Sequence, residues 1–484
     1  MTPLTVLYAA IALWLAAYGL NALVLAVLYL RHRAEVPSPP PVCRDDLPPV
    51  TVQLPTYNER QVIDRAIDAV ATLDYPRDRL QIQILDDSTD ETTHLARQRA
   101  ALHRSEGLDI QVLRRSDRQG FKAGALAWGL RQARGDYVAI FDADFRPRPD
   151  FLLRTVPYFL DRPDLGLVQT RWSHLNADYS PFTRAQAMAF DGHFVVEQTA
   201  RDRSGLLMNF NGTAGVWRKR CIEESGGWTA QTLSEDLDLS YRAQLDGWET
   251  LYLPSVDAPA ELPPQMAAFK RQQARWTQGS IQTLRKLIAP IVRSRRLTVV
   301  QKGMALLHLS GYLAHTLMVL LLVVTLPMLL LGVEPPSVGN VGLAMGLGPL
   351  LIYVISQRWL HRDWTRRLVT LPLLILVGIG IAWNNAVATW RGLTRWGGTF
   401  ARTPKFRVEG KADHWLDSAY RLHVDATAIG ESGLAIYALL ATAVAYRAGQ
   451  PAMVPFLLLY AAAFGTVAII ELAQGFPLRR PTST

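Results

Sequence analysis

The chain has few cysteines and no charged residue near its start. Only Cys43 and Cys221 occur among 484 residues, which is too few for a disulfide framework or a cysteine-rich metal site, so we expect a reduced cytosolic face. Residues 1–30 contain no Asp, Glu, Lys, Arg or His. This stretch is long enough to cross a bilayer, and basic residues follow it at 31–33. A secretory signal would have a shorter apolar core and a cleavage site, so we predict an uncleaved transmembrane helix.

Internal repeats and low-complexity tracts are also absent from the sequence. The net charge of +9 is compatible with a nucleic-acid partner, but the basic residues gather beside apolar segments, as they do on cytoplasmic membrane flanks. We therefore expect the lipid bilayer as a partner and no nucleic acid. Five further apolar runs lie at residues 304–331, 341–355, 369–388, 434–445 and 453–472.

The basic residues predict how these runs cross the membrane. If residues 31–33 are cytoplasmic, the run 304–331 crosses the membrane away from the cytoplasm and the run 341–355 crosses back to it. These two transmembrane helices form the segment 304–357. A complete span at 369–388 would then place six basic residues outside: Arg391, Arg395, Arg402, Lys405, Arg407 and Lys411. We therefore predict an interfacial or re-entrant segment at 358–399 and two last transmembrane helices within 430–473. This topology describes a multi-pass plasma (inner) membrane protein with a cytoplasmic C-terminus.

Between the membrane segments, the sequence predicts an α/β domain. A proline-rich linker at 31–49 leads into it. Short segments that predict strands lie at 50–54, 81–85, 110–113, 137–141 and 165–170, and helical stretches separate several of them. This alternation predicts a doubly wound, Rossmann-like parallel sheet over residues 50–262, with ligands bound beyond the carboxyl ends of its strands. Interfacial helices are expected at 263–303, and the last residues, 474–484, form a tail.

Acidic side chains follow the predicted strands. Asp142 and Asp144 end the run at 137–141, and Asp86 and Asp87 end the run at 81–85. An Asp-x-Asp at a strand end places both carboxylates on one side of the turn, where hard oxygen ligands can hold Mg²⁺ or Mn²⁺ against a diphosphate. Two aspartates after a strand are also common as turn and capping residues, so the interpretation depends on the other motifs.

Seven ordered motifs carry a family resemblance. They are PTYNE at 55–59, DDSTD at 86–90, DAD at 142–144, FNGTAG at 210–215, SED at 234–236, QxxRW at 272–276 and FARTPK at 400–405. From residue 50 to 410, the chain resembles the membrane-embedded, inverting family 2 glycosyltransferases, which include bacterial cellulose synthase catalytic subunits. It is most similar to the plant cellulose synthase-like A mannan and glucomannan synthases, because cellulose synthases usually have Cys where this chain has Asn211. The resemblance implies a cytosolic, nucleotide-sugar-binding GT-A domain inserted between transmembrane helices, and a gating loop at 400–411.

The resemblance also implies roles for single residues. Those implied in donor binding are Pro55, Thr56, Tyr57, Glu59, Asp86, Asp87, Lys122, Asp142, Asp144, Gln272, Arg275, Thr403 and Lys405. Those implied in acceptor binding are Trp276, Asn211, Gly212 and Thr213. Asp142 and Asp144 would be the metal ligands, and the Mg²⁺ or Mn²⁺ ion would neutralise charge on the departing diphosphate.

Asp236, together with Glu235, is the candidate catalytic group. Inversion requires an acceptor hydroxyl to attack the anomeric carbon from the face opposite the leaving diphosphate, while a carboxylate takes the proton. An ordinary aspartate is ionised at neutral pH and can do this. Ser234 replaces the usual threonine of the family and keeps its hydroxyl. The alternative, that both carboxylates only cap a helix over 237–245, is physically sensible.

Three functional hypotheses follow from the sequence. The first is a processive synthase that polymerises a β-1,4-mannan, glucomannan or glucan from UDP-glucose or GDP-mannose and passes the growing glycan across the membrane, with or without export partner subunits. The second is a non-processive lipid glycosyltransferase similar to ceramide glucosyltransferases, against which the gating loop argues. The third is a non-enzymatic scaffold, against which the intact acidic motifs argue. Only residues 473–484 follow the last apolar run, so we expect no cyclic-dinucleotide-sensing domain within this chain.

Overall fold

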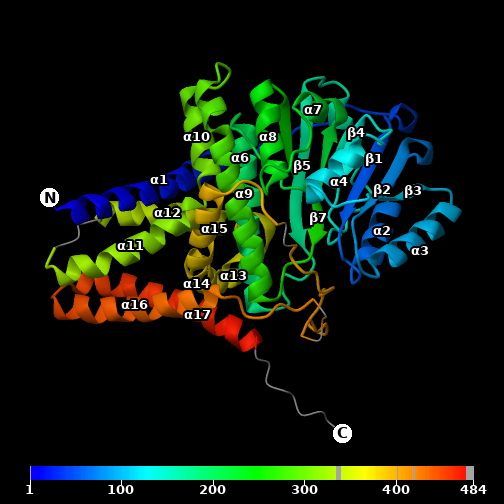
Figure 1. Ribbon diagram of the computed structural model, residues 1–484. Coiled ribbons are helices and arrows are strands. Elements are labelled where there is room, and N and C mark those ends of the chain that lie inside the picture. Colours follow the sequence, from blue (N-terminus) through cyan, green and yellow to red (C-terminus); the bar gives the residue numbers. More distant parts are fainter. Residues whose placement is uncertain (1, 334–338, 400–401, 417, 419, 476–484) are drawn as a thin grey trace, which may run out of the picture.

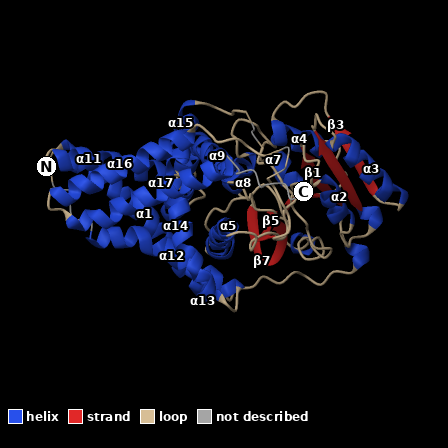
Figure 2. Cartoon of the chain, turned by 90° about the horizontal axis from the view of Figure 1, so that it is seen from below, coloured by secondary structure: helices blue, strands red, loops and turns tan. Residues whose placement is uncertain are grey.

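The computed structural model describes residues 2–333, 339–399, 402–416, 418 and 420–475, without the side chains of 339–345. An α/β domain lies on one side, and a bundle of long helices extends away from it on the other (Figure 1). The view turned by 90° separates the same two parts, with all strands in the domain and α1, α11 and α16 in the bundle (Figure 2). Residues 400 and 401 of the predicted gating loop, and the tail from 476, lie outside the described residues.

The domain is built on a seven-stranded sheet with the order β3-β2-β1-β4-β6-β5-β7. Its strands are β1 (Val50–Thr56), β2 (Leu80–Asp86), β3 (Asp109–Arg114), β4 (Tyr137–Ile140), β5 (Leu165–His174), β6 (Gly215–Arg218) and β7 (Glu249–Ala260). The prediction of a wholly parallel sheet was wrong, because β6 runs antiparallel to both β4 and β5. With only four residues, β6 is too short for an alternation of apolar and polar residues to indicate a strand in the sequence. It is a strand because it pairs with β4 and β5.

Both faces of the sheet are buried. Along β4, Tyr137 and Ala139 belong to one hydrophobic cluster, whereas Val138 and Ile140 belong to another on the opposite face. The helices of the domain are α2 (Ile63–Ala71), α3 (Thr92–Ser105), α4 (Phe121–Leu130), α5 (Pro181–Asp191), α6 (Gln198–Arg203), α7 (Lys219–Glu224) and α8 (Glu235–Asp246). A π-helical turn at Gly192–Glu197 joins α5 to α6. Double coverage explains why the four residues of β4, Tyr137–Ile140, are all apolar.

Helix α9 (Met266–Arg293) connects the domain to the bundle and lies between them (Figure 1). It is followed by α10 (Val299–Leu309) and α11 (Leu313–Leu330), so the apolar run 304–331 is not one continuous helix. The other helices of the bundle are α1 (Pro3–His32), α12 (Gly339–Leu360), α13 (Trp364–Arg367), α14 (Leu371–Gly380), α15 (Ala382–Thr394), α16 (Thr427–Arg447) and α17 (Val454–Gly475).

Among the described residues, four helices are long and apolar enough to cross a membrane: α1, α11, α16 and the helix ending at Gly475. A fifth candidate is the pair Trp364–Gly380 and Ala382–Thr394, which is bent by 40° at its break and forms either a broken span or a re-entrant loop. The interfacial or re-entrant arrangement of 358–399 stays a prediction.

Candidate active site

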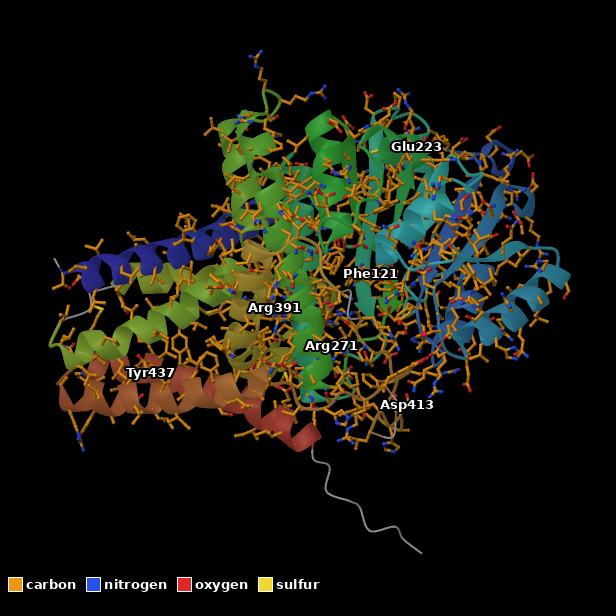
Figure 3. The ribbon with its side chains drawn as sticks, in the orientation of Figure 1. Phe121, Glu223, Arg271, Arg391, Asp413 and Tyr437 are labelled. Atoms are coloured by element: carbon orange, nitrogen blue, oxygen red, sulfur yellow. The ribbon has the colours of Figure 1, made fainter. Side chains whose placement is uncertain are left out.

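A cavity opens at the carboxyl ends of β1 and β4, beside the starts of α8 and α9. The predicted site residues that line it are Pro55, Thr56, Tyr57, Glu59, Asp87, Lys122, Asp142, Asp144, Asn211, Gly212, Glu235, Asp236, Gln272, Arg275, Trp276, Thr403 and Lys405. Figure 3 shows Arg271, one residue before Gln272, between the domain and the bundle, whereas Tyr437 of α16 lies far out in the bundle. The cavity therefore lies where the sheet meets α9.

Asp86 and Thr213 are the two predicted site residues outside the lining. The carboxylate of Asp86 is fully buried and accepts hydrogen bonds from the Ser88 N–H at 2.9 Å and the Thr93 hydroxyl at 2.7 Å. The hydroxyl of Thr213 accepts a hydrogen bond from the Asp142 N–H at 2.9 Å. Both side chains thus hold the loops that carry the cavity residues.

One end of the cavity offers a flat ring and several charges. The guanidinium carbon of Arg118 lies 3.3 Å from the centre of the Tyr57 ring, a cation–π contact. Arg402 donates to Glu59 at 2.8 Å. Burial raises the pKa of Glu59 to about 7 although Arg402 opposes this shift. Sequence reasoning missed Arg118 as a cavity residue, because an arginine in a polar loop carries no periodic signal.

The Asp-x-Asp carboxylates each face a lysine. Asp142 accepts from the Lys122 ammonium at 2.6 Å, and Asp144 accepts from the Lys405 ammonium at 2.5 Å. Burial alone would lower the pKa of both lysines, but the carboxylates outweigh it and raise the pKa, so both lysines are charged at neutral pH.

The same two aspartates are chemically suited to a divalent cation. Among the described residues, no group of three Asp, Glu, His or Cys side chains could hold a metal ion. Mg²⁺ commonly uses one or two carboxylates together with substrate phosphates and water, which fits the two carboxylates of this turn. The donor set therefore fits a cation that arrives with a diphosphate.

The candidate catalytic carboxylates begin α8. Glu235 is buried, and its carboxylate lies 4.0 Å from the Lys122 ammonium. Asp236 faces Gly212, where an added Cβ atom would lie 2.7 Å from the Asp236 Oδ2 atom. Gly212 has φ +82°, a conformation that favours glycine, so the FNGTAG loop can approach the carboxylate closely. Burial raises the pKa of both carboxyl groups, that of Glu235 to about 7. Each group therefore binds a proton at a pH closer to neutral than an ordinary carboxyl group does.

Aromatic side chains form another part of the cavity. The Trp276 ring lies 6.5 Å from the Trp172 ring and 5.8 Å from the Phe190 ring, between ring centres. Such faces suit the apolar C–H surface of a sugar. Trp172 and Phe190 were not predicted, because aromatic residues in β5 and α5 have the ordinary appearance of core residues.

Comparisons with known proteins show which sequences and folds this chain is similar to. Residues 48–279 match the family described as "Glycosyltransferase like family 2". "Glucomannan 4-beta-mannosyltransferase 1" of Oryza sativa subsp. japonica is 44% identical over 259 residues, which cover 53% of this chain and 50% of that protein. "Probable glucomannan 4-beta-mannosyltransferase 11" of Arabidopsis thaliana is 43% identical over 261 residues, which cover 53% and 59%. The chain thus spans about half the length of the curated relatives it matches.

A solved structure shares the fold. Mannosyltransferase PcManGT from Pyrobaculum calidifontis, determined in complex with GDP-Man and Mn²⁺, superposes with a TM-score of 0.53 and 22% identity, covering 80% of this chain and 99% of that one. This likeness confirms the GT-A architecture predicted from the sequence, and the relatives confirm the resemblance to the cellulose synthase-like A branch. Residues 48–279 therefore match the family 2 glycosyltransferases in sequence, and the domain that contains them has the GT-A fold.

Proposed function

We propose that this protein is an inverting β-mannosyltransferase that elongates a β-1,4-linked mannan or glucomannan with GDP-mannose as donor. The main support is that one cavity contains the Asp142 and Asp144 carboxylates, the candidate base Asp236 and the aromatic face of Trp276. The names of the relatives favour mannose over glucose, and GDP-Man is the ligand named for the structural neighbour.

The proposed reaction uses the two sides of the cavity differently. Asp236 accepts the proton of an acceptor hydroxyl while that oxygen forms a bond to the anomeric carbon. The bond between this carbon and the diphosphate oxygen breaks on the opposite face, so the configuration inverts. Lys122 and Lys405 supply fixed positive charge to the leaving diphosphate. When bound by Asp142 and Asp144, a Mg²⁺ or Mn²⁺ ion supplies further charge neutralisation.

Processive elongation is part of the proposal because the acceptor side adjoins the helix bundle. Helix α9, which carries Arg275 and Trp276, packs against α15 and α17. The segment after residue 401 packs over the domain, with Thr403, Phe406 and Val408 buried. A product that remains on the aromatic faces after transfer could move one unit towards the bundle and accept the next sugar there.

Product analysis tests the proposal. The purified full-length protein, in lipid, receives labelled GDP-mannose or, separately, labelled UDP-glucose, each with Mg²⁺ or Mn²⁺. We expect a high-mass product from GDP-mannose that a β-1,4-mannanase digests. Incorporation from UDP-glucose alone would contradict the donor assignment, and a single-sugar product soluble in organic solvent would replace processive synthesis with lipid glycosylation.

A glycine in α9 provides a test of how the site is held together. A Cβ atom at Gly279 would lie 2.1 Å from the Ser234 Oγ atom and 2.8 Å from the Ser234 nitrogen, so α9 packs directly on the start of α8. We expect Gly279→Ala to displace Glu235 and Asp236 relative to Arg275 and to lower the rate of mannosyl transfer at least about tenfold, by the overpacking mechanism. The rate is measured with saturating GDP-mannose.

Gly303→Ala is the matched control for this change. Gly303 lies in α10, and an added Cβ atom there meets nothing within 4 Å. Because alanine is the better helix former by about 1 kcal/mol, Gly303→Ala is expected to retain activity and stability. Wild-type rates for Gly279→Ala would show that the contact between α8 and α9 does not position the carboxylates.

A further inference from the structure

Asn211 lies in the wall of the cavity, and polar side chains behind it hold it in place. Asn211 lines the cavity, and its neighbour Gly212 faces Asp236. On the other side of Asn211 lie His193 and Gln198, from the π-helical turn and the start of α6. His193 and Gln198 are not in the cavity lining, and both hold Asn211, which is.

The hydrogen bonds fix the direction of each group in this chain. The Gln198 Nε2 atom donates to the backbone carbonyl of Asn209 at 2.9 Å and to the Asn211 Oδ1 atom at 2.8 Å. A backbone carbonyl only accepts, so the Gln198 amide must present its nitrogen, and Asn211 must present its oxygen to it. The Asn211 Nδ2 atom therefore faces His193.

The same reasoning assigns the proton on His193. The His193 Nε2 atom lies 3.1 Å from the Asn211 Nδ2 atom and must accept, so a neutral His193 carries its proton on Nδ1. That N–H donates to Glu197 Oε2 at 2.9 Å. Burial would raise the pKa of Glu197, but the hydrogen bond from His193 and the positive charges nearby lower it, so Glu197 accepts this hydrogen bond as a carboxylate.

The π-helical turn explains how two side chains reach the same partner. His193 and Gln198, the two side chains that reach Asn211, are five residues apart, which is the i→i+5 spacing of a π-helix. The turn packs against α12 through Gly192, where an added Cβ atom would lie 2.9 Å from Ile352. Such turns are less stable than α-helix and are often found at functional sites. An uninterrupted α-helix would change the direction of every side chain after Gly192.

We infer that His193 is a positioning residue for the sugar acceptor: through Asn211 it presents an amide N–H to an oxygen of the acceptor glycan. One N–H of the Asn211 amide is used by His193, and the other has no acceptor among the residues that the structure describes. Asn211 shares the cavity with Asp236 and Trp276, the groups proposed to meet the acceptor. This inference rests on the proposed function and adds the residues that orient the acceptor.

The test separates acceptor binding from donor binding. The full-length protein in lipid transfers mannose from GDP-mannose to soluble β-1,4-mannohexaose, and the KM of each substrate is measured. We expect His193→Ala to raise the KM for mannohexaose about five- to tenfold, the value of one lost hydrogen bond, and to leave the KM for GDP-mannose within about twofold. His193→Gln should restore much of the acceptor affinity, because the glutamine oxygen can accept from Asn211 as the imidazole nitrogen does.

His94→Ala, at an exposed position of α3, is the matched control and should change neither KM. If His193→Ala does not fold, Glu197→Gln still tests the inference, with a smaller rise in acceptor KM. An unchanged acceptor KM in His193→Ala or, where that variant does not fold, in Glu197→Gln would overturn it, and so would an equal rise in both KM values. Absence of any mannosyl product from the wild-type protein would instead overturn the proposed function.

Discussion

Asp236→Asn is expected to lower the rate of mannosyl transfer about 100- to 10,000-fold, the range for loss of a general base, with little change in the KM for GDP-mannose. Asparagine has the size of aspartate and can still accept the hydrogen bond that the Asp236 Oδ1 atom receives from the Leu237 N–H at 2.8 Å. It cannot accept the acceptor's proton. Initial rates with labelled GDP-mannose give both constants.

The stability of the Asp236→Asn variant shows whether a lower rate comes from the loss of the base or from unfolding of the protein. Burial raises the pKa of Asp236, so the folded state binds a proton more tightly than the unfolded state, and the ionised carboxylate lowers stability as the pH rises through the raised pKa. The neutral asparagine avoids this cost, so we expect a thermal midpoint equal to or above that of the wild type at pH 8. Asp246→Asn, exposed in the last turn of the same helix, is the control and should leave the rate unchanged. Unchanged activity in Asp236→Asn would remove Asp236 from the catalytic role.

Several strands were predictable from short segments rich in aliphatic residues and bounded by polar or turn residues. The runs ending at Leu54, Leu85 and Phe141 match β1, β2 and β4 to within two residues. Strand β6 and the antiparallel pairing at Trp217 were not predictable, because Gly215–Arg218 gains its strand conformation from neighbours distant in sequence. The break between α10 and α11 was not predictable either. Residues 310–312 separate the two helices, but they lie within one long run of apolar composition.

The site was predictable to the extent that its residues stand in motifs. Residues as far apart as Tyr57 and Lys405 line one cavity, as the ordered motifs predicted. Side chains outside the motifs were not found: Arg118 stacks on Tyr57 from a polar loop, and His193 reaches Asn211 from a π-helical turn. Their roles depend on contacts between segments, and a single sequence does not show such contacts.

Lys270 is a further residue that no motif indicated, although it has a strong structural role. It lies in α9, and its ammonium is 2.7 Å from a Glu431 carboxylate oxygen of α16 and 2.6 Å from a Glu471 carboxylate oxygen of α17. All three side chains are buried. The Lys270 carbonyl also accepts from Asn384 of α15 at 3.0 Å. The ion cluster therefore joins the helix that carries Arg275 and Trp276 to α16 and α17, and the hydrogen bond from Asn384 joins it to α15.

Lys270→Met is expected to destabilise the protein by about 3–5 kcal/mol, because removing one partner of a buried ion pair leaves uncompensated charge, here on two carboxylates. The free energy change is measured by denaturant unfolding in detergent, and transfer activity should fall with it, since α9 would lose its connection to α16 and α17. Lys411→Met, at an exposed position, is the control and should unfold as the wild type does.

The triple variant Lys270→Met, Glu431→Gln, Glu471→Gln distinguishes buried charge from lost packing. With both carboxylates made neutral, no uncompensated charge remains, and we expect much of the lost stability to return, because the uncompensated charge is the main cost of removing Lys270 alone. If the triple variant unfolds as readily as Lys270→Met, the packing of the lysine chain rather than its charge holds α9 in place. If Lys270→Met itself unfolds as the wild type does, the cluster does not hold α9 to α16 and α17, and the position of Trp276 must depend on the other packing contacts of α9, with α8, α10, α15 and α17.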